Sequence, residues 1–367
     1  MRVGVIGAGQ LARMMVPPAV ELGVELRVFA ENAGDSARIA VTATGDYRNA
    51  EDLLRFAATV DVVTFDHEHV PQDVLVALAA AGVPMHPSPA ALIFAQDKIA
   101  MRERLAALGL PVPDWAAVES HAELEAFIAA HGGRCVVKTP RGGYDGKGVR
   151  LVSAATEVAD WFGGGPLLAE ELVEFRRELS QLLARTPSGE VVTWPVVESV
   201  QRDGVCAEVI APAPNSRGKI ADVAADIATS VAQNLGVTGV LAVELFETTD
   251  ERLVINELAM RPHNSGHFSI DGSRTSQFEQ HLRAVLDLPL GPTDSREPWT
   301  VMVNVLGGVP DLPGRYAGAF ADQPGVKLHF YGKEPRPGRK VGHVTAMGDD
   351  LEEVVYRARA AAAFFEV

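Results

Sequence analysis

The hydrophobic pattern of this chain changes near residue 96, and that change limits the folds it can adopt. Before this point, short apolar runs at 3–8, 25–30 and 60–65 alternate with helical patterns such as the one at 50–59. Strands that alternate with helices predict a parallel sheet. After residue 96 the pattern indicates antiparallel strands mixed with helices. We therefore expect an α/β region followed by an α+β region.

The second region contains several strand candidates and one clear helix. The strand candidates lie at 135–139, 148–152, 166–173, 179–186 and 191–200. The helix spans 222–235, places Val223 and three further apolar residues on one face, and ends at Gly236 as a C-cap. In the first region, Pro17 and Pro18 fall inside an expected helix. Because proline removes a helical hydrogen bond, we predict a kink or an early end there.

The composition indicates a soluble globular protein of two or three domains. The chain has 367 residues, of which 47% are hydrophobic and 22% charged. No apolar run approaches the ~20 residues of a spanning helix, and no secretory signal is visible, so we expect a cytoplasmic protein without membrane contact. Cys135 and Cys206 lie far apart and predict neither a disulfide framework nor a zinc ribbon. The net charge of −15 argues against a nucleic-acid binder, because such proteins need a basic surface.

A glycine-rich turn follows the first strand candidate. Gly7 and Gly9 open a helix, and Glu31 lies roughly twenty residues on, which fits a dinucleotide fingerprint. An NAD-dependent oxidoreductase is therefore one hypothesis. The glycines do not identify NAD by themselves, since they allow a backbone to approach any phosphate at a helix N-terminus.

A second glycine-rich segment, 141–148, lies between two strand candidates and follows Lys138. Such a loop can offer backbone amides to a polyphosphate, and a strand lysine can neutralise a fixed phosphate. The alternative is a long hairpin turn with a surface lysine. We favour the phosphate-binding loop, because turns rarely need this much glycine and basic charge together.

Two acids, Glu244 and Glu257, lie on neighbouring apolar strands joined by the polar turn 248–252. On an antiparallel hairpin they could face one another. Burying acids is costly unless a cation pairs with them, and Mg²⁺ commonly binds one or two carboxylates plus nucleotide phosphates. The pair therefore predicts a magnesium site, with Asn256 as a further oxygen ligand candidate. A solvated acidic strand face is the alternative.

Dense polar residues follow Glu257 in the segment 257–267. Arg261, His263, Asn264 and His267 come directly after the strand, and polar groups at a strand end usually mark a site. A zinc site from His263 and His267 is possible on spacing alone, but no cysteine or further histidine follows nearby.

Two other segments carry binding candidates. The run 67–69, His-Glu-His, is a second weak indication of a metal site, no stronger than the spacing of His263 and His267. An exposed loop is the simpler interpretation. A basic run near the C-terminus suits a phosphate, with a solvated basic face as the alternative. Its members are Lys333, Arg336, Arg339, Lys340 and His343.

Seven ordered strings resemble those of the 5-(carboxyamino)imidazole ribonucleotide synthase family, and they span essentially the whole chain. They are GAGQLARM, QDK, VVKTPRGGYDGKG, AEELVEFRRELS, WPVVESVQRDG, INELAMRPHNSGH and YGKEPRPGRKVGH. The resemblance implies an ATP-grasp fold. It would consist of a Rossmann-like pre-ATP-grasp domain at 1–95, an ATP-grasp nucleotide clamp at 96–290 with a flexible lid around 115–180, and a small C-terminal domain at 291–367. Members are typically homodimers.

The resemblance also implies an activity and its residues. ATP would carboxylate the amine of aminoimidazole ribonucleotide, with bicarbonate as co-substrate and Mg²⁺ held by Glu244 and Glu257. The implied ATP contacts are Lys98, Lys138, Gly143, Tyr144, Asp145, Gly146, Lys147, Gly148, Glu170, Glu171, Leu172, Val173, Glu178, Asn256 and Glu257. The implied ribonucleotide contacts are Gln10, Leu11, Glu68, Arg261, His263, Asn264, Lys333, Arg339 and Lys340. The implied catalytic residues are Tyr144, Lys147, Arg261 and His263, with Tyr144 and Lys147 holding bicarbonate.

The chain departs from the family pattern at two positions. Lys147 stands where many members have arginine, which keeps the charge and loses the bidentate fork. Gln201 stands where many members have histidine. Rival hypotheses are a biotin carboxylase, a formate-dependent glycinamide ribonucleotide transformylase, an NAD-dependent oxidoreductase, and a nucleotide-binding regulator without turnover. The C-terminal string argues against the first two.

Overall fold

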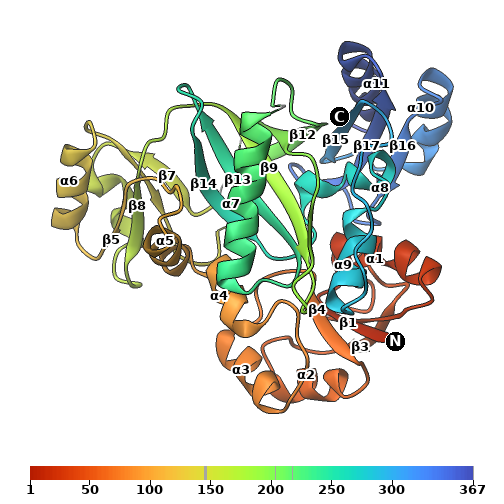
Figure 1. The fold of residues 1–367 in the computed structure, drawn as a ribbon, viewed down its shortest axis with the longest axis horizontal. Coiled ribbons are helices and arrows are strands. Elements are labelled where there is room, and N and C mark those ends of the chain that lie inside the picture. The colour runs from red at the N-terminus through yellow and green to blue at the C-terminus, as the bar shows by residue number, and fades with distance from the viewer. Residues whose placement is uncertain (144–146, 203, 217, 367) are drawn as a thin grey trace.

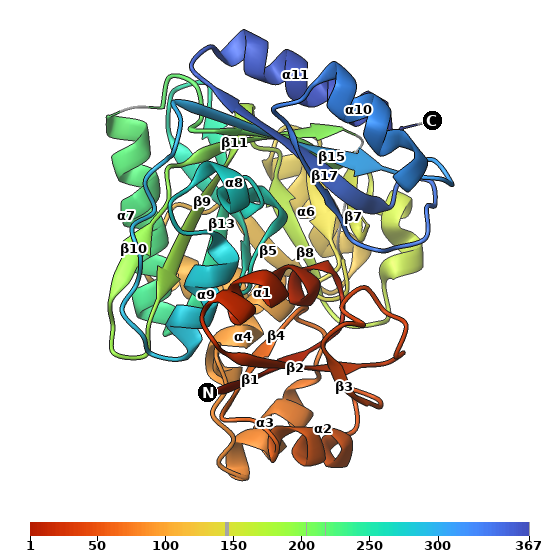
Figure 2. The same ribbon diagram turned by 90° about the vertical axis from the view of Figure 1, so that its right-hand side faces the viewer.

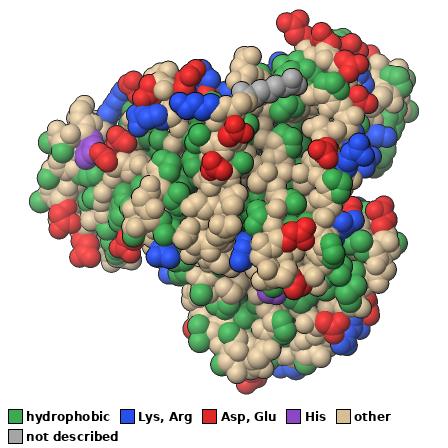
Figure 3. All heavy atoms as spheres, in the orientation of Figure 1, with side chains coloured by type: hydrophobic (Ala, Val, Ile, Leu, Met, Phe, Trp, Pro, Cys, Tyr) green, Lys and Arg blue, Asp and Glu red, His purple; other side chains and the backbone are tan. Residues whose placement is uncertain are grey.

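The computed structural model describes the chain except for residues 144–146, 203, 217 and 367. In Figure 1 the N-terminal region lies at the bottom and a small sheet at the left, while a larger central sheet continues into the C-terminal region at the upper right. Among the described residues, no helix is long and apolar enough to cross a membrane. Acidic and basic side chains are interspersed over the face in Figure 3.

The N-terminal sheet is parallel, with strand order β3-β2-β1-β4, as the alternating pattern predicts. Its elements are β1 (Arg2–Ile6), α1 (Gln10–Glu21), β2 (Glu25–Ala30), β3 (Val41–Thr44), α2 (Ala50–Ala57), β4 (Val62–Phe65), α3 (Gln72–Ala80) and α4 (Pro89–Gln96). All four residues of β4 are buried, because helices cover parallel strands on both faces. The weakly apolar β3 was absent from our predictions.

Helix α1 does not end at its prolines. It continues through Pro17 and Pro18 to Glu21, so the early end that we predicted is wrong. Proline has a helical φ and costs mainly the missing N–H donor. The buried face of α1 includes Leu11 and Met15 and packs beside Phe278 of α9 (Gln277–Val285). This packing outweighs the lost hydrogen bonds.

A small antiparallel sheet with order β5-β8-β6-β7, here called the lid sheet, has a hydrophobic core of its own. Its elements are β5 (Trp115–Val118), α6 (His121–Ala130), β6 (Cys135–Lys138), β7 (Val149–Val152), the 3-10 helix η1 (Ala155–Trp161) and β8 (Leu167–Glu171). Helix α5 (Lys98–Ala107) leads into it from the N-terminal region.

The central sheet has the order β14-β13-β9-β11-β12-β15-β17-β16, with β10 paired to β9. Its first strands and their helix are β9 (Phe175–Arg185), β10 (Val191–Thr193), β11 (Val197–Arg202), β12 (Val205–Ala211), α7 (Lys219–Leu235), β13 (Gly239–Thr248) and β14 (Leu253–Ala259). Helix α7 ends at left-handed Gly236, as predicted. Its buried face runs through Ala224, and Val223 is 37% exposed, so that residue was placed on the wrong face.

The C-terminal strands belong to the same sheet, because β15 pairs with β12. This part contains η2 (Asn264–Gly266), α8 (Ser269–Gly272), β15 (Trp299–Leu306), η3 (Pro313–Arg315), α10 (Tyr316–Asp322), β16 (Lys327–Phe330), β17 (Lys340–Gly348) and α11 (Leu351–Ala363). The predicted division at 290/291 thus separates segments that share one sheet.

The N-terminal sheet is fastened to the central sheet by a buried histidine. Figure 2 shows α9 beside α1. His281 of α9 contacts a strand of each sheet. Its Nδ1 accepts from the Val240 amide at 3.0 Å, and its Nε2 lies 2.7 Å from Thr64 Oγ1 on β4. Since Nδ1 accepts, the neutral ring donates from Nε2. Burial lowers the pKa of His281 to about 3.

Candidate active site

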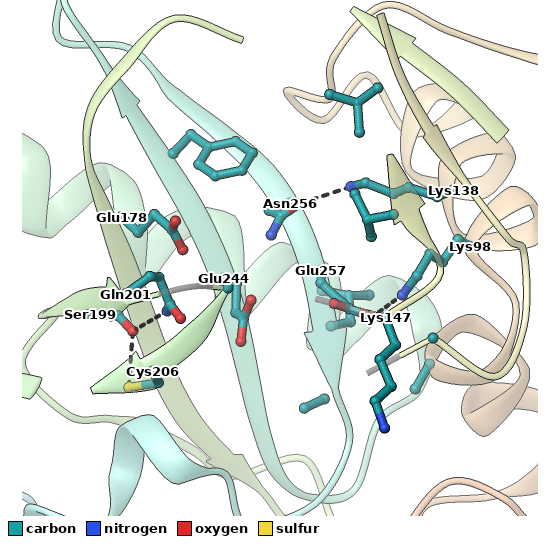
Figure 4. A pocket seen from close by; sticks show the side chains of 18 of the residues that line it. Lys98, Lys138, Lys147, Glu178, Ser199, Gln201, Cys206, Glu244, Asn256 and Glu257 are labelled. Atoms are coloured by element: carbon teal, nitrogen blue, oxygen red, sulfur yellow. Dashed lines mark hydrogen bonds and ion pairs between the residues drawn. The ribbon is translucent and has the colours of Figure 1, made fainter. Parts of the chain in front are cut away.

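A cleft of about 680 Å³ lies between the lid sheet, the central sheet and the N-terminal region. Figure 4 shows lysines at one end and acids of the central strands beside them. The sequence-predicted residues that line it are Glu68, Lys98, Lys138, Gly143, Lys147, Glu170, Glu171, Leu172, Val173, Glu178, Glu244, Asn256, Glu257, Arg261, His263, Asn264 and Lys340. Distant segments therefore converge on one hollow.

The two strand acids lie opposite each other, as the hairpin predicted. Glu244 on β13 is the antiparallel partner of Glu257 on β14. Burial, together with Glu257 and then Glu178, raises the pKa of Glu244 to about 7. Glu257 is paired with Lys98, and Glu244 lies 3.3 Å from His263 Nε2. Two crowded carboxylates of this kind fit Mg²⁺, which would relieve their repulsion.

The lysine end of the cleft contains a buried network. Lys138 is 9% exposed, and its Nζ lies 2.7 Å from Glu170 Oε2 and 3.1 Å from Asn256 Oδ1. Burial lowers the pKa of Lys138 despite the neighbouring carboxylate. Glu170 is also paired with Arg102 of α5, and these two cations outweigh burial and lower the pKa of Glu170. Its carboxylate is thus committed to protein partners.

The glycine loop is anchored to the start of α5. Lys98 N donates to Pro140 O at 3.0 Å, and Arg141 Nε lies 2.9 Å from Asp97 Oδ2. Gly148 has a φ of +72°, and a Cβ there would lie 2.4 Å from the Thr139 hydroxyl. The predicted residues Tyr144, Asp145 and Gly146 lie outside the described residues. Gly148 belongs to the loop stem and does not line the cleft.

Two aromatic residues that the sequence did not single out lie beside the predicted nucleotide contacts. Phe175 and Phe246 stack with ring centroids 4.5 Å apart and line the cleft near Glu178. Burial raises the pKa of Glu178, while a hydrogen bond from Gln201 partly offsets the shift. Gln201, which stands where many family members have histidine, also donates to Ser199 Oγ at 2.9 Å. Phe175 lies on β9 and Phe246 on its neighbour β13, so the pairing of distant segments brings them together.

The predicted ribonucleotide contacts divide between two hollows. Glu68, Arg261, His263, Asn264 and Lys340 line the main cleft, whereas Lys333 and Arg339 line a second hollow of about 440 Å³ beside the N-terminal turn.

Individual contacts refine these assignments. Arg261 Nε lies 2.7 Å from Glu68 Oε2, and burial together with Arg261 lowers the pKa of His263 to about 3. Gln10 bonds to Lys333. The Leu11 side chain is buried in the core and lines neither hollow.

The N-terminal glycine turn is occupied by a protein carboxylate. Asp66 accepts from Gly9 N at 3.0 Å and from Ala12 N at 2.7 Å. A Cβ on Gly9 would lie 2.2 Å from Asp66 Oδ2, so this glycine is needed for the approach of Asp66. Glu31 pairs with Arg48 at 3.0 Å. Asp66 therefore takes the amides of Gly9 and Ala12 that would receive a dinucleotide phosphate, which argues against the NAD hypothesis, and the turn itself borders the second hollow.

The histidine segments do not form the suggested metal sites. His267 is buried, and its Nδ1 lies 2.9 Å from Gln277 Nε2, while Glu68 is committed to Arg261. Within the part of the chain that the structure describes, no three His, Cys, Asp or Glu side chains converge as a metal site. The facing carboxylates of Glu244 and Glu257 offer the oxygen donors that Mg²⁺ prefers.

Three family models match the chain. They describe a ribonucleotide synthetase preATP-grasp domain at 1–96, an ATP-grasp domain at 103–278 and a phosphoribosylaminoimidazole carboxylase C-terminal domain at 300–357. A Corynebacterium ammoniagenes N5-carboxyaminoimidazole ribonucleotide synthase is 51% identical and covers 99% of this chain and 91% of its own. The Mycobacterium bovis protein of that name is 50% identical and covers 98% and 86%.

Solved structures show the same fold. An Aspergillus clavatus N5-carboxyaminoimidazole synthase in complex with ADP and 5-aminoimidazole ribonucleotide superposes with a TM-score of 0.89. It has 32% identity and covers 99% of this chain and 98% of its own. A Thermus thermophilus synthetase superposes with a TM-score of 0.88 at 36% identity, covering 99% and 97%. The chain therefore belongs to the N5-carboxyaminoimidazole ribonucleotide synthase family and has the ATP-grasp fold.

Proposed function

We propose that this chain is an ATP-dependent ligase of purine biosynthesis. It carboxylates the exocyclic amine of 5-aminoimidazole ribonucleotide to N5-carboxyaminoimidazole ribonucleotide and releases ADP and phosphate. Relatives of that name match nearly the whole chain. The observation that carries the proposal is the cleft in which basic residues, the paired acids Glu244 and Glu257, and the Glu68–Arg261 pair face a shared space.

The nucleotide is assigned to the lysine end of the cleft. Lys98 and Lys138 meet the phosphates, the 143–148 loop covers them, and the segment 170–173 lines the adenine pocket with Glu178 at the ribose. Asn256 and Glu257 complete the ATP contacts. Glu170 contributes through Lys138, since its own carboxylate is engaged.

We assign Mg²⁺ to Glu244 and Glu257. Their crowding supports this, as does the raised pKa of Glu244. When bound, Mg²⁺ would supply electrostatic stabilisation to the transferring phosphoryl group. We assign the ribonucleotide to the opposite end, where Glu68, Arg261 and His263 meet. Gln10, Leu11, Asn264, Lys333, Arg339 and Lys340 complete its proposed contacts.

The proposed chemistry has two steps. An oxygen of bicarbonate attacks the γ-phosphorus of ATP, the β–γ phosphoryl bond breaks, and ADP leaves with the electron pair, which gives carboxyphosphate. Lys138 and the loop amides stabilise the charge. The substrate amine then attacks the carboxyl carbon of carboxyphosphate, or of the CO₂ it releases. Phosphate departs and the amine loses a proton, and loop closure excludes water.

Bicarbonate is assigned to Tyr144 and Lys147 of the loop, with Arg261 and His263 as the further catalytic residues. We expect Tyr144→Phe and Lys147→Ala to uncouple ATP hydrolysis from carboxylation. The measurement is the ratio of ADP to carboxylated product. Intact coupled turnover in both variants would contradict the assignment.

The deciding experiment measures ADP release with ATP, Mg²⁺ and bicarbonate, with and without aminoimidazole ribonucleotide. We expect release to require the ribonucleotide. Release that is indifferent to it would favour another ATP-grasp enzyme, such as a biotin carboxylase or glycinamide ribonucleotide transformylase. No release under either condition would favour a regulator without turnover.

We further propose a cytoplasmic homodimer built from domains 1–95, 96–290 and 291–367, with a mobile lid around 115–180. The family resemblance supports the dimer and the domains, and the core of the lid sheet supports an independently moving lid. Light scattering on the purified chain tests the oligomeric state. A mass near the 39.1 kDa of one chain would contradict the dimer.

A further inference from the structure

A closed ring of polar contacts joins the lid sheet to the central sheet behind the cleft. Arg102 on α5 donates from Nε to Glu170 on β8, and from Nη2 to the backbone carbonyl of Asn256 on β14 at 2.7 Å. Lys138 on β6 contacts the other oxygen of Glu170 at 2.7 Å and the side chain of Asn256 at 3.1 Å. Figure 4 shows the Lys138–Asn256 link. Both neighbours of Lys138 are therefore held by one arginine.

The stability of the fold does not explain why this ring consists of charged residues. Arg102 is 0% exposed and Glu170 is 2% exposed, so two charges are removed from water. Arg102 Nη1 has no hydrogen-bond partner among the described residues. Buried ion pairs are weak stabilisers, because desolvation offsets their attraction, and apolar residues of similar size often do as well. A role in positioning explains the charged ring better.

The geometry indicates what is positioned. Without Arg102, Lys138 would be the remaining cation bonded to Glu170, and its ammonium would be drawn onto that carboxylate instead of being shared between Glu170 and Asn256. Arg102 takes one carboxylate oxygen and the Asn256 carbonyl through its planar fork. The Glu170 charge is then shared, and Lys138 keeps its place in the cleft wall.

We propose that Arg102 is a positioning residue that acts through Glu170 and Asn256 to hold the Lys138 ammonium toward the nucleotide phosphates. The inference rests on the proposed function, because it needs Lys138 to meet phosphate. It extends the ATP site to a residue that has no place in the cleft lining. It also gives α5 a second task beside presenting Lys98, because one helix would then set both phosphate-facing lysines.

The test is a double-mutant cycle on the full chain, with binding of ADP and of adenosine measured by calorimetry. We expect Arg102→Met to weaken ADP binding about tenfold, the size of a lost charge-assisted hydrogen bond, and to leave adenosine binding unchanged. In a Lys138→Met background the same change should have no further effect on ADP. Arg104→Met, an exposed arginine on the same helix, is the matched control and should change neither ligand.

Two results would overturn the inference. Equal weakening of ADP and adenosine by Arg102→Met would indicate a structural role, and so would further weakening of ADP in the Lys138→Met background. If Lys138→Met itself left ADP binding unchanged, the nucleotide assignment under the proposed function would fail as well. If Arg102→Met does not fold, Arg102→Lys completes the cycle. It keeps the charge on a single nitrogen, so we expect a loss of ADP affinity smaller than tenfold, again absent in the Lys138→Met background.

Discussion

The two glycine-rich segments look alike in sequence and do different work in the structure. The N-terminal turn packs its helix amides onto Asp66, a carboxylate of the protein itself. The segment from 141 to 148 instead leaves its stem beside the cleft, fastened to α5 through Pro140 and Asp97. Glycine permits close approach in both places, and the neighbouring element decides whether protein or ligand approaches.

The largest predicted effect concerns the lysine beneath the second segment. Replacing Lys138 with Met removes a cation preorganised for phosphate, which typically costs about 10²–10³-fold in rate. We expect kcat/KM for ATP to fall by about that factor, measured by ADP release in the presence of the ribonucleotide. A loss below about threefold would mean that Lys138 does not meet the nucleotide phosphates.

Alanine substitutions at one glycine in each segment should separate their roles. Gly9→Ala forces a methyl group toward Asp66 and should lower the free energy of unfolding by about 1–3 kcal/mol, with KM for ATP unchanged in the folded protein. Gly148→Ala places alanine at a φ of +72° in the loop stem. It should raise KM for ATP and lower the free energy of unfolding by less than Gly9→Ala does. Chemical denaturation and steady-state kinetics measure the two. The reverse pattern would break the distinction between the segments.

Acid should weaken the attachment of the N-terminal region to the central sheet. His281 is neutral in the folded protein, with a pKa lowered to about 3 by burial, whereas an unfolded histidine titrates near pH 6.5. The unfolded state therefore binds the extra proton as pH falls below 6.5, and stability drops by up to about 1.4 kcal/mol per pH unit for this group. We expect His281→Gln to have a shallower slope between pH 6.5 and 4.5, measured by denaturant unfolding. An unchanged slope would exclude His281 as the source.

The smallest effect is expected where Asp66 loses its charge. Asp66→Asn keeps one acceptor oxygen for the Gly9 and Ala12 amides, turns an NH2 group toward the other amide, and removes a negative charge at the start of α1. The loss should be about 1 kcal/mol in unfolding free energy, because one part-buried N–H loses its partner. Thermal unfolding measures it, and KM for ATP should not change, because Asp66 does not line the nucleotide cleft. Binding of NAD by the unaltered protein, followed by nicotinamide fluorescence, would contradict the view that Asp66 fills the phosphate position.

Local patterns predicted much of the fold and part of the cleft, and the family resemblance supplied the other residues that line it. Alternating apolar runs predicted the parallel N-terminal sheet, and the hairpin spacing predicted that Glu244 and Glu257 face each other. The failures share a physical cause. The packing of α1 against α9 overrode the local preference of Pro17 to end the helix. The packing of α7 on β9 left Val223 exposed. In both cases the packing partner is distant in sequence.

The sequence by itself determined the family, the order of strands and helices in the first region, and which residue types could meet phosphate and metal, because these follow from composition, periodicity and motif. Only the tertiary structure decided which of these residues lie together. It filled the N-terminal turn with Asp66, 57 residues away from Gly9, and it divided the basic C-terminal run between two hollows. It also buried Arg102 behind Lys138. These outcomes depend on contacts between distant segments, which local propensity does not encode.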